Sequence, residues 1–372
     1  MSVRISSIFG IPVKIHYTLI LAVLLISWTL AAGYMPREYP GLSAGEYWTI
    51  GIIGSITLFT SVLIHELAHS YVAKRNGLPV RRIVLFIFGG VSEIEAEPKT
   101  PNLEFKVSIA GPASSYVIGI FLWICWRILS VDRLDAVFVA PLEYGSYINV
   151  LLASFNLLPA FPLDGGRILR AAIWRRSKDF LRATDAATKV GVAFSYLFIF
   201  GGLAGVFLGS LASGLWFILI GWFLKNGAEA NLRQTLISEA LSNVSVEDIM
   251  TREVHSVKPD LSVAELVDEY FSKYKHGGFP VATGSTLLGL VTTEDVRKIP
   301  KEKWKDTRTE EIMTPCSRLT CLRPEDMAID AFMKMSSLSV GRLPVRRDGE
   351  VAGIVTRSDI MRVVEIRLEL GR

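Results

Sequence analysis

Six apolar runs fill the first 226 residues of the chain, and each approaches the roughly 20 residues that a helix needs to cross a bilayer. From about Ser242 onward charged residues recur every few positions, and no apolar run is long enough to span. We therefore expect a polytopic α-helical membrane domain of about six transmembrane helices, followed by a soluble part. The expected spans cover residues 15–33, 47–73, 106–128, 144–163, 189–208 and 211–226.

Basic residues are distributed unevenly between the loops that join these spans. Those after the second and fourth spans are Lys74, Arg75, Arg81, Arg82, Lys99, Arg167, Arg170, Arg175, Arg176, Lys178 and Arg182. The opposite loops keep little beyond Arg37 and Arg133. Because cytoplasmic loops are rich in lysine and arginine, both termini and the soluble part are expected to face the cytosol of a multi-pass cell membrane protein. The net charge of +4 is small, and no nucleic acid partner is expected.

The second span contains the sequence "VLIHELAHSYVAK" at residues 62–74, with the spacing H-E-x-x-H. Residues four apart share a helix face, so His65 and His69 can offer ring nitrogens to one metal ion, while Glu66 reaches a water beside it. This layout is typical of zinc hydrolases, in which the carboxylate acts as general acid and base. A satisfied structural cluster is the alternative, although ionisable groups in a bilayer cost about 2.5–3.5 kcal/mol each.

Two histidines leave zinc without a third protein ligand. The stretch "NLLPAFPLDGGR", residues 156–167, ends the fourth span with two prolines and two glycines, so Asp164 can return toward the site on an unwound helix end. We expect Asp164 to be the third ligand of one Zn²⁺ per chain. The alternative is an exposed acid at a helix C-terminus, where the helix dipole disfavours a negative charge.

With these residues in view, the chain resembles the site-2 protease family of intramembrane zinc metalloproteases. "HELAH" and "FPLDGG" match that family's two metal motifs, and the resemblance covers residues 1–230. It implies His65, His69 and Asp164 as zinc ligands, Glu66 as the catalytic residue, and a transmembrane helix of another protein as the substrate.

Three further stretches resemble the family less specifically. "FGGVSEIE", Phe88 to Glu95, alternates like a short strand whose edge could receive an unwound substrate segment. Asn156 either hydrogen-bonds the substrate or the developing oxyanion, or packs as a helix amide. "AGPASS", Ala110 to Ser115, matches a small-residue turn of the family, and no catalytic role is drawn from it.

The soluble part contains an internal repeat, because residues 245–299 can be laid on residues 308–364 with an offset of 63 or 64. The pair resembles tandem cystathionine-β-synthase (CBS) domains, which form one α/β module. The expected domains are an intramembrane metalloprotease domain at 1–228, a linker at 229–244, and CBS repeats at 245–302 and 303–372.

The CBS resemblance implies clefts for adenine nucleotides. In "TTED" and "TRSD", Thr292 and Thr356 would supply hydroxyls to phosphate, and Asp295 and Asp359 would bind ribose. The alternative is a purely structural module that serves as a homodimerisation surface. A short helical linker could transmit the ligand state or dimerisation of the module to the zinc site.

Together these patterns predict an intramembrane zinc metalloendopeptidase that cuts transmembrane proteins within the lipid bilayer. A CBS-regulated transporter or channel with an intramembrane ion site is the main competing function. The second competing function is an inactive scaffold that binds membrane proteins. The joint presence of H-E-x-x-H and a distant "LDGG" favours the protease, since a pore requires neither.

Overall fold

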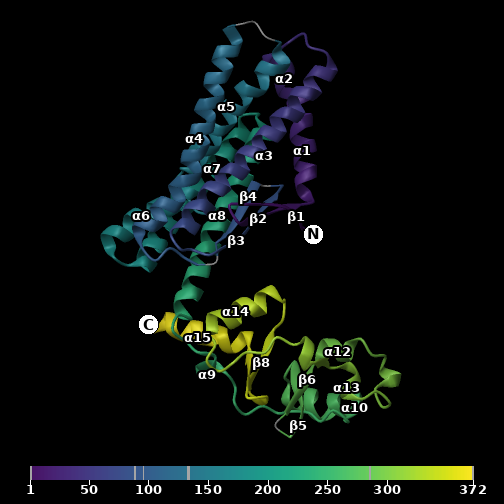
Figure 1. Cartoon of the computed structure of the whole chain (residues 1–372). Coiled ribbons are helices and arrows are strands. Elements are labelled where there is room, and N and C mark those ends of the chain that lie inside the picture. The colour runs from purple at the N-terminus through teal and green to yellow at the C-terminus, as the bar shows by residue number, and fades with distance from the viewer. Residues whose placement is uncertain (1, 88, 95, 132–134, 285, 371–372) are drawn as a thin grey trace. The chain divides into compact units, whose positions relative to one another are not determined.

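The structure of the chain, a computed structural model, describes residues 2–87, 89–94, 96–131, 135–284 and 286–370. It divides into two compact units, Met1–Arg233 and Gln234–Arg372. Within the described ranges, six helical stretches are long and apolar enough to cross a membrane, which confirms the predicted polytopic class (Figure 1). They are Thr18–Glu38, formed by α1 (Thr18–Thr29), the π-helical η1 (Leu30–Tyr34) and α2 (Met35–Glu38), and the helices α3 (Ala44–Arg75), α4 (Pro101–Val131), α5 (Ala136–Asn156), α7 (Phe180–Phe207) and α8 (Leu211–Ala240).

The outer surfaces of these helices are apolar. In α7 only 17% of the most apolar stretch is buried, and the side chains of Leu197, Phe200 and Phe207 are exposed. Soluble proteins rarely expose contiguous apolar surface on this scale, whereas lipid chains cover it without cost. The first unit is therefore built for the interior of a bilayer.

Helix α3 packs against α1, α4 and α5. It begins at a capping box in which Ser43 and Glu46 satisfy each other's backbone N–H groups, and it ends after the basic residues Lys74 and Arg75. Small residues bring α1 close to it: the hydroxyls of Ser27 and Ser55 lie 2.9 Å apart. This close packing makes α3 a fixed platform for the side chains that it carries.

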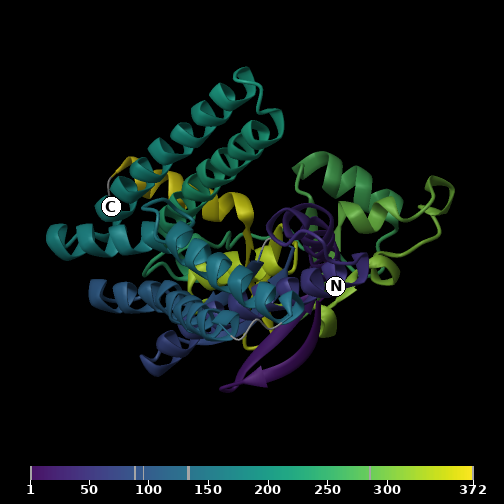
Figure 2. The same cartoon turned by 90° about the horizontal axis from the view of Figure 1, so that it is seen from above.

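A four-stranded sheet accompanies the helices of the first unit. Its strands are β1 (Ser2–Ile8), β2 (Ile11–His16), β3 (Val80–Phe86) and β4 (Gly89–Ile94), in the order β1-β2-β3-β4. The β2–β3 pair is parallel and the other two pairs are antiparallel. Strands β3 and β4 pack against α3 (Figure 2 gives a second view of the helices around it).

The strand predicted at residues 88–95 is present as β4, at one end of the strand order. The first and last residues of the predicted segment, Phe88 and Glu95, lie outside the described residues. The six residues between them pair with β3 in antiparallel register, from Gly89 opposite Phe86 to Ile94 opposite Val80. Strand β4 therefore pairs with β3 and is the last strand in the order of this sheet.

Several predicted span boundaries differ from those in the structure, and those of the fourth and sixth spans bear on the site and the linker. The sequence predicts the fourth span at 144–163, but α5 covers Ala136–Asn156 and a turn follows, because Pro159 and Pro162 cannot continue a helix. A new helix, α6 (Asp164–Ser177), starts after that turn. The sixth span is predicted to end at 226, yet α8 continues to Ala240, through most of the expected linker, which contains no proline.

The second unit holds two similar halves around one sheet. Its strands are β5 (Gly278–Thr283), β6 (Thr286–Thr292), β7 (Thr314–Pro315), β8 (Arg342–Arg347) and β9 (Glu350–Thr356), in the order β5-β6-β9-β8 with β7 on β6. The helical segments are α9 (Val246–Ile249), α10 (Val263–Glu265), η2 (Leu266–Phe271), α11 (Ser272–Tyr274), α12 (Thr293–Arg297), η3 (Lys301–Lys303), α13 (Thr309–Ile312), η4 (Cys316–Arg318), α14 (Ala328–Ser337) and α15 (Arg357–Glu369).

The two halves exchange their first segments. Val246 and Ile249, at the start of the first repeat, lie in the hydrophobic core of the second repeat. Ile312 and Met313, at the start of the second, pack against the core of the first. Because each core is completed by the other repeat, the two repeats form one α/β module, as the sequence predicts.

Candidate metal centre

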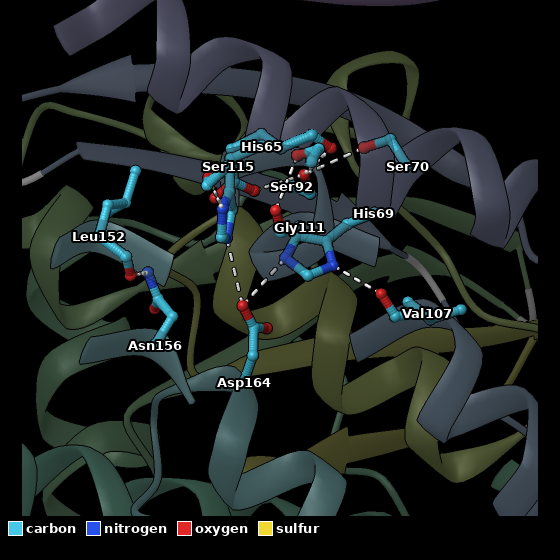
Figure 3. Close-up of polar contacts among 12 residues, drawn as sticks. His65, His69, Ser70, Ser92, Val107, Gly111, Ser115, Leu152, Asn156 and Asp164 are labelled. Carbon is cyan, nitrogen blue, oxygen red and sulfur yellow. Dashed lines mark hydrogen bonds and ion pairs between the residues drawn. The ribbon is translucent and has the colours of Figure 1, made fainter. Parts of the chain in front are cut away.

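Three side chains of the first unit converge on one point (Figure 3). Nε2 of His65 lies 3.2 Å from Oδ2 of Asp164, and Nε2 of His69 lies 3.1 Å from the same oxygen. The three residues are 4%, 5% and 9% exposed, and their ligand atoms all lie within 4.8 Å of one another. The structure thus brings together the two histidines of the H-E-x-x-H motif and the aspartate predicted to join them.

Asp164 reaches the histidines because of the turn between α5 and α6. It is the first residue of α6, so its carboxylate lies at a helix N-terminus, where the helix dipole favours negative charge. The alternative of an exposed acid at a helix C-terminus is therefore wrong, and Asp164 begins a new helix instead of lying on an unwound end of the fourth span. Gly165 and Gly166 allow the turn to close, since a Cβ atom on Gly165 would collide with the carbonyl groups of Leu157 and Leu158.

The other ring nitrogen of each histidine has a partner on α4. Nδ1 of His65 lies 2.9 Å from the hydroxyl of Ser115, and Nδ1 of His69 lies 2.6 Å from the carbonyl oxygen of Val107. Gly111 stands between these two, and a Cβ atom there would overlap both imidazole rings. Residues 107, 111 and 115 are four apart and share one face of α4. Their role was not predicted, although the four-residue spacing of Gly111 and Ser115 in an expected span was a usable signal.

Glu66 contacts β4. The hydroxyl of Ser92 donates to its Oε2 at 2.7 Å, and the hydroxyl of Ser70 lies 3.0 Å from that of Ser92. Gly90 permits the strand to approach, because a Cβ there would lie 2.5 Å from Cγ of Glu66. The catalytic candidate is thus held between α3 and β4 by Ser92, which lies in the stretch "FGGVSEIE" but for which the sequence predicts no role.

A cavity of about 610 Å³ opens onto the cluster. Glu66, Ser92, Asp164 and Asn156 all line it, together with apolar side chains. Nδ2 of Asn156 donates one hydrogen bond to the carbonyl oxygen of Leu152 in its own helix, at 2.9 Å. An amide nitrogen carries two hydrogens, and no side chain or carbonyl group among the described residues accepts the second one of Asn156.

The donor set fits a zinc ion. Two imidazole nitrogens and a carboxylate oxygen are a typical catalytic zinc set that leaves a position open. Metal-binding histidines usually donate their second N–H to a carbonyl or similar acceptor, and Val107 and Ser115 place such oxygens beside Nδ1 of the two rings. Both Nε2 atoms thereby face the common point with Asp164.

The CBS residues named from the sequence form two similar pairs. The hydroxyl of Thr292 donates to Oδ2 of Asp295 at 2.7 Å, and the hydroxyl of Thr356 donates to Oδ2 of Asp359 at 2.7 Å. Each pair is a capping box that begins a helix, α12 or α15. These four polar groups therefore have a structural role whether or not a nucleotide binds.

Only one of the two pairs lines the cavity of about 360 Å³ in the second unit. Thr356 and Asp359 contribute to its wall, whereas Thr292 and Asp295 do not. The basic residues Lys275 and Arg342 also line it, as does the acidic Glu253, and burial lowers the pKa of Arg342. The remaining polar lining residues are Thr251, His255, His276 and Ser358.

Comparison with known proteins finds a matching family for each of the two units. The model of peptidase family M50 matches residues 53–131 and 127–198, and the CBS domain model matches residues 246–302 and 310–366. Rip3 of Mycobacterium tuberculosis is 32% identical over 98% of this chain and 93% of its own length. Zinc metalloprotease MJ0392 of Methanocaldococcus jannaschii is 32% identical over 99% of this chain and 97% of its own length. The solved site-2 protease from the same archaeon is 33% identical over 62% of this chain and 94% of that one, with a TM-score of 0.42. The chain therefore belongs to peptidase family M50, the site-2 protease family of zinc metalloproteases, and carries two CBS domains after its membrane-spanning part.

Proposed function

We propose that His65, His69 and Asp164 hold one zinc ion and that Glu66 is the catalytic acid and base of peptide bond hydrolysis. The observation that carries this proposal is the convergence of three buried ligand atoms within 4.8 Å on helices of a membrane protein. When bound, zinc supplies Lewis acidity that lowers the pKa of a water molecule and polarises a carbonyl group.

Glu66 is positioned for proton transfer rather than for ligation. Its carboxylate accepts from Ser92 on β4, and both residues line the cavity. It would take a proton from the attacking water and return it to the leaving amine. The second amide N–H of Asn156, which lines the same cavity, would stabilise the negative charge that develops on the carbonyl oxygen.

The substrate that suits this cavity is a transmembrane segment of another protein. Much of the lining is apolar, including Phe59, Leu152 and Trp216. A helical segment hides its peptide bonds, so it must be held extended to be cut. Strand β4 lies at the end of the sheet order and lines the cavity, and an extended substrate strand would add to it through backbone hydrogen bonds.

We further propose that the termini and the CBS module lie in the cytosol. This follows from the excess of lysine and arginine in the loops after the second and fourth spans.

The CBS module is proposed to bind an adenine nucleotide and to regulate access to the zinc site. Thr356 and Asp359 line a cavity with basic side chains, which suits phosphate groups. Helix α8 runs from a membrane span to Ala240, a core residue of the second unit, so most of the expected linker is regular helix that could transmit a change of ligand state. The same module would also serve as the contact between two copies of the chain.

Zinc content per chain tests the metal site without knowledge of the substrate. We would purify the full chain in mild detergent as wild type, His65→Ala and Asp164→Ala, with Ser114→Ala as a control whose lost hydrogen bond lies within α4. About one zinc in the wild type and the control, lost or weakened in both ligand variants, is expected. A wild type that binds no zinc after metal-replete purification would overturn the proposal and favour a transporter.

A further inference from the structure

A buried ion pair joins α6 to α4 beside the proposed zinc site. Nε of Arg170 donates to Oε1 of Glu104 at 2.7 Å, and Nη2 of Arg170 contacts the same oxygen. The two side chains are 3% and 0% exposed. A second carboxylate, that of Glu97, lies 3.6 Å from Nη2 and is about half exposed.

Arg170 contacts the chain on both sides of Asp164. It lies on α6, six residues after Asp164, and its guanidinium lies 5.3 Å from the ring centre of Phe161 in the preceding turn. The same guanidinium lies 4.7 Å from the ring centre of Phe180, which follows α6 in the chain and begins α7. One guanidinium thus links the turn that precedes Asp164, the helix that begins with it, and the next helix.

Glu104 lies on the helix that orients both histidines. It precedes Val107 by three residues on α4, the helix that also carries Gly111 and Ser115. The ion pair therefore connects the element that holds Asp164 to the element that holds the rings of His65 and His69. No other ion pair among the described residues joins α4 to α6.

Stability alone is a poor explanation for this pair. Oε2 of Glu104 and Nη1 of Arg170 are buried and have no hydrogen-bond partner among the described residues. Removing two charges from water is costly, and apolar side chains of similar volume often stabilise a fold as well or better. A buried ion pair can instead hold the two elements that it joins in one fixed position relative to each other.

We propose that Glu104 and Arg170 are positioning residues that fix Asp164 against His65 and His69 at the distances needed for metal binding. The inference rests on the proposed zinc site and adds a residue pair outside it. Loss of the pair leaves the three ligands present but lets α6 shift against α4, so the site binds metal more weakly and with altered geometry.

Cobalt(II) binding to the full chain in detergent tests this, because the visible absorption of the ion reports ligand geometry independently of activity. The first variant is Arg170→Lys, which keeps the charge opposite Glu104 but loses the planar fork. Its control is Arg182→Lys, at an exposed pair with Asp179. The second variant, Glu104→Gln with Arg170→Met, removes both charges and leaves neither unpaired.

We expect Arg170→Lys and the double variant to keep their helix content while losing about tenfold or more in cobalt affinity, with a changed absorption band. The Arg182→Lys control should match the wild type. Wild-type affinity and spectrum in either Arg170 variant would overturn the proposal. If both Arg170 variants unfold, the proposal is also overturned, because the ion pair is then needed for the stability of the fold. A wild type that binds no cobalt, or a His65→Ala variant that binds it normally, would instead refute the metal site itself.

Discussion

The hydroxyl of Ser115 on α4 lies 2.9 Å from Nδ1 of His65 on α3, although 50 positions separate the two residues. This contact determines the direction of the ring, because Nδ1 is occupied and Nε2 faces His69 and Asp164. A partner of this kind usually raises the metal affinity of a histidine ligand by about 10- to 100-fold.

Ser115→Ala is therefore expected to weaken zinc binding by about tenfold, since the ring of His65 loses the acceptor that orients it. Competition with a chelator of known affinity measures the change. The control is Ser114→Ala, whose hydroxyl donates to the carbonyl oxygen of Gly111 in its own helix at 2.7 Å. Equal affinities of wild type and Ser115→Ala would show that the ring is oriented by other contacts.

Gly111→Ala should abolish zinc binding or weaken it severely. The added methyl group would overlap both imidazole rings, and neither ring can retreat because Ser115 and Val107 lie behind them. Gly201→Ala on α7 is the matched control, since nothing lies within 4 Å of its Cβ position. Zinc content and thermal stability are measured for both variants. A Gly111→Ala variant that keeps its full zinc content would contradict the close contact of α4 with the two rings.

Much of this arrangement follows from local sequence patterns. Apolar runs determine the membrane helices, and the H-E-x-x-H spacing alone places His65 and His69 on one helix face. Asp164 could be predicted because two prolines and two glycines must break the helix near it. That the acid begins a new helix could not, since the pattern shows where a helix ends but not how the chain continues.

The supporting residues depend on contacts between helices and are harder to predict. Ser115, Ser92 and Arg170 act on residues tens of positions away, and although Ser115 and Ser92 lie in stretches that resemble the family, the sequence does not indicate which residues they contact. Small residues four apart indicate that a helix is approached closely, but not by which partner. Thr356 and Thr292 occupy equivalent positions in the repeats, and only the folded module shows that one of them lines the cavity of about 360 Å³.

Glu66→Gln should keep its zinc and lose at least about 100-fold in cleavage rate, because the amide cannot accept the proton of the attacking water. Ser92→Ala should also keep its zinc but lose a smaller factor, since Glu66 then lacks the donor at 2.7 Å that holds it. Cleavage of reporter proteins with single transmembrane segments, in membranes, measures both rates. If Glu66→Gln cleaved at the wild-type rate, Glu66 would not be the base.

The capping boxes at Thr292 and Thr356 allow a structural role to be separated from ligand binding. Thr356→Ala and Thr292→Ala each remove a hydroxyl that bonds an aspartate at 2.7 Å at the start of a helix, and each should cost about 1 kcal/mol of stability. Only Thr356 lines the cavity of about 360 Å³, so only Thr356→Ala should also weaken nucleotide binding there. Titration calorimetry of the full chain with AMP and with ATP measures the affinity, and thermal unfolding measures the stability. Equal loss of affinity in both variants would place the nucleotide elsewhere in the module, and no binding by the wild type would leave the module a purely structural role.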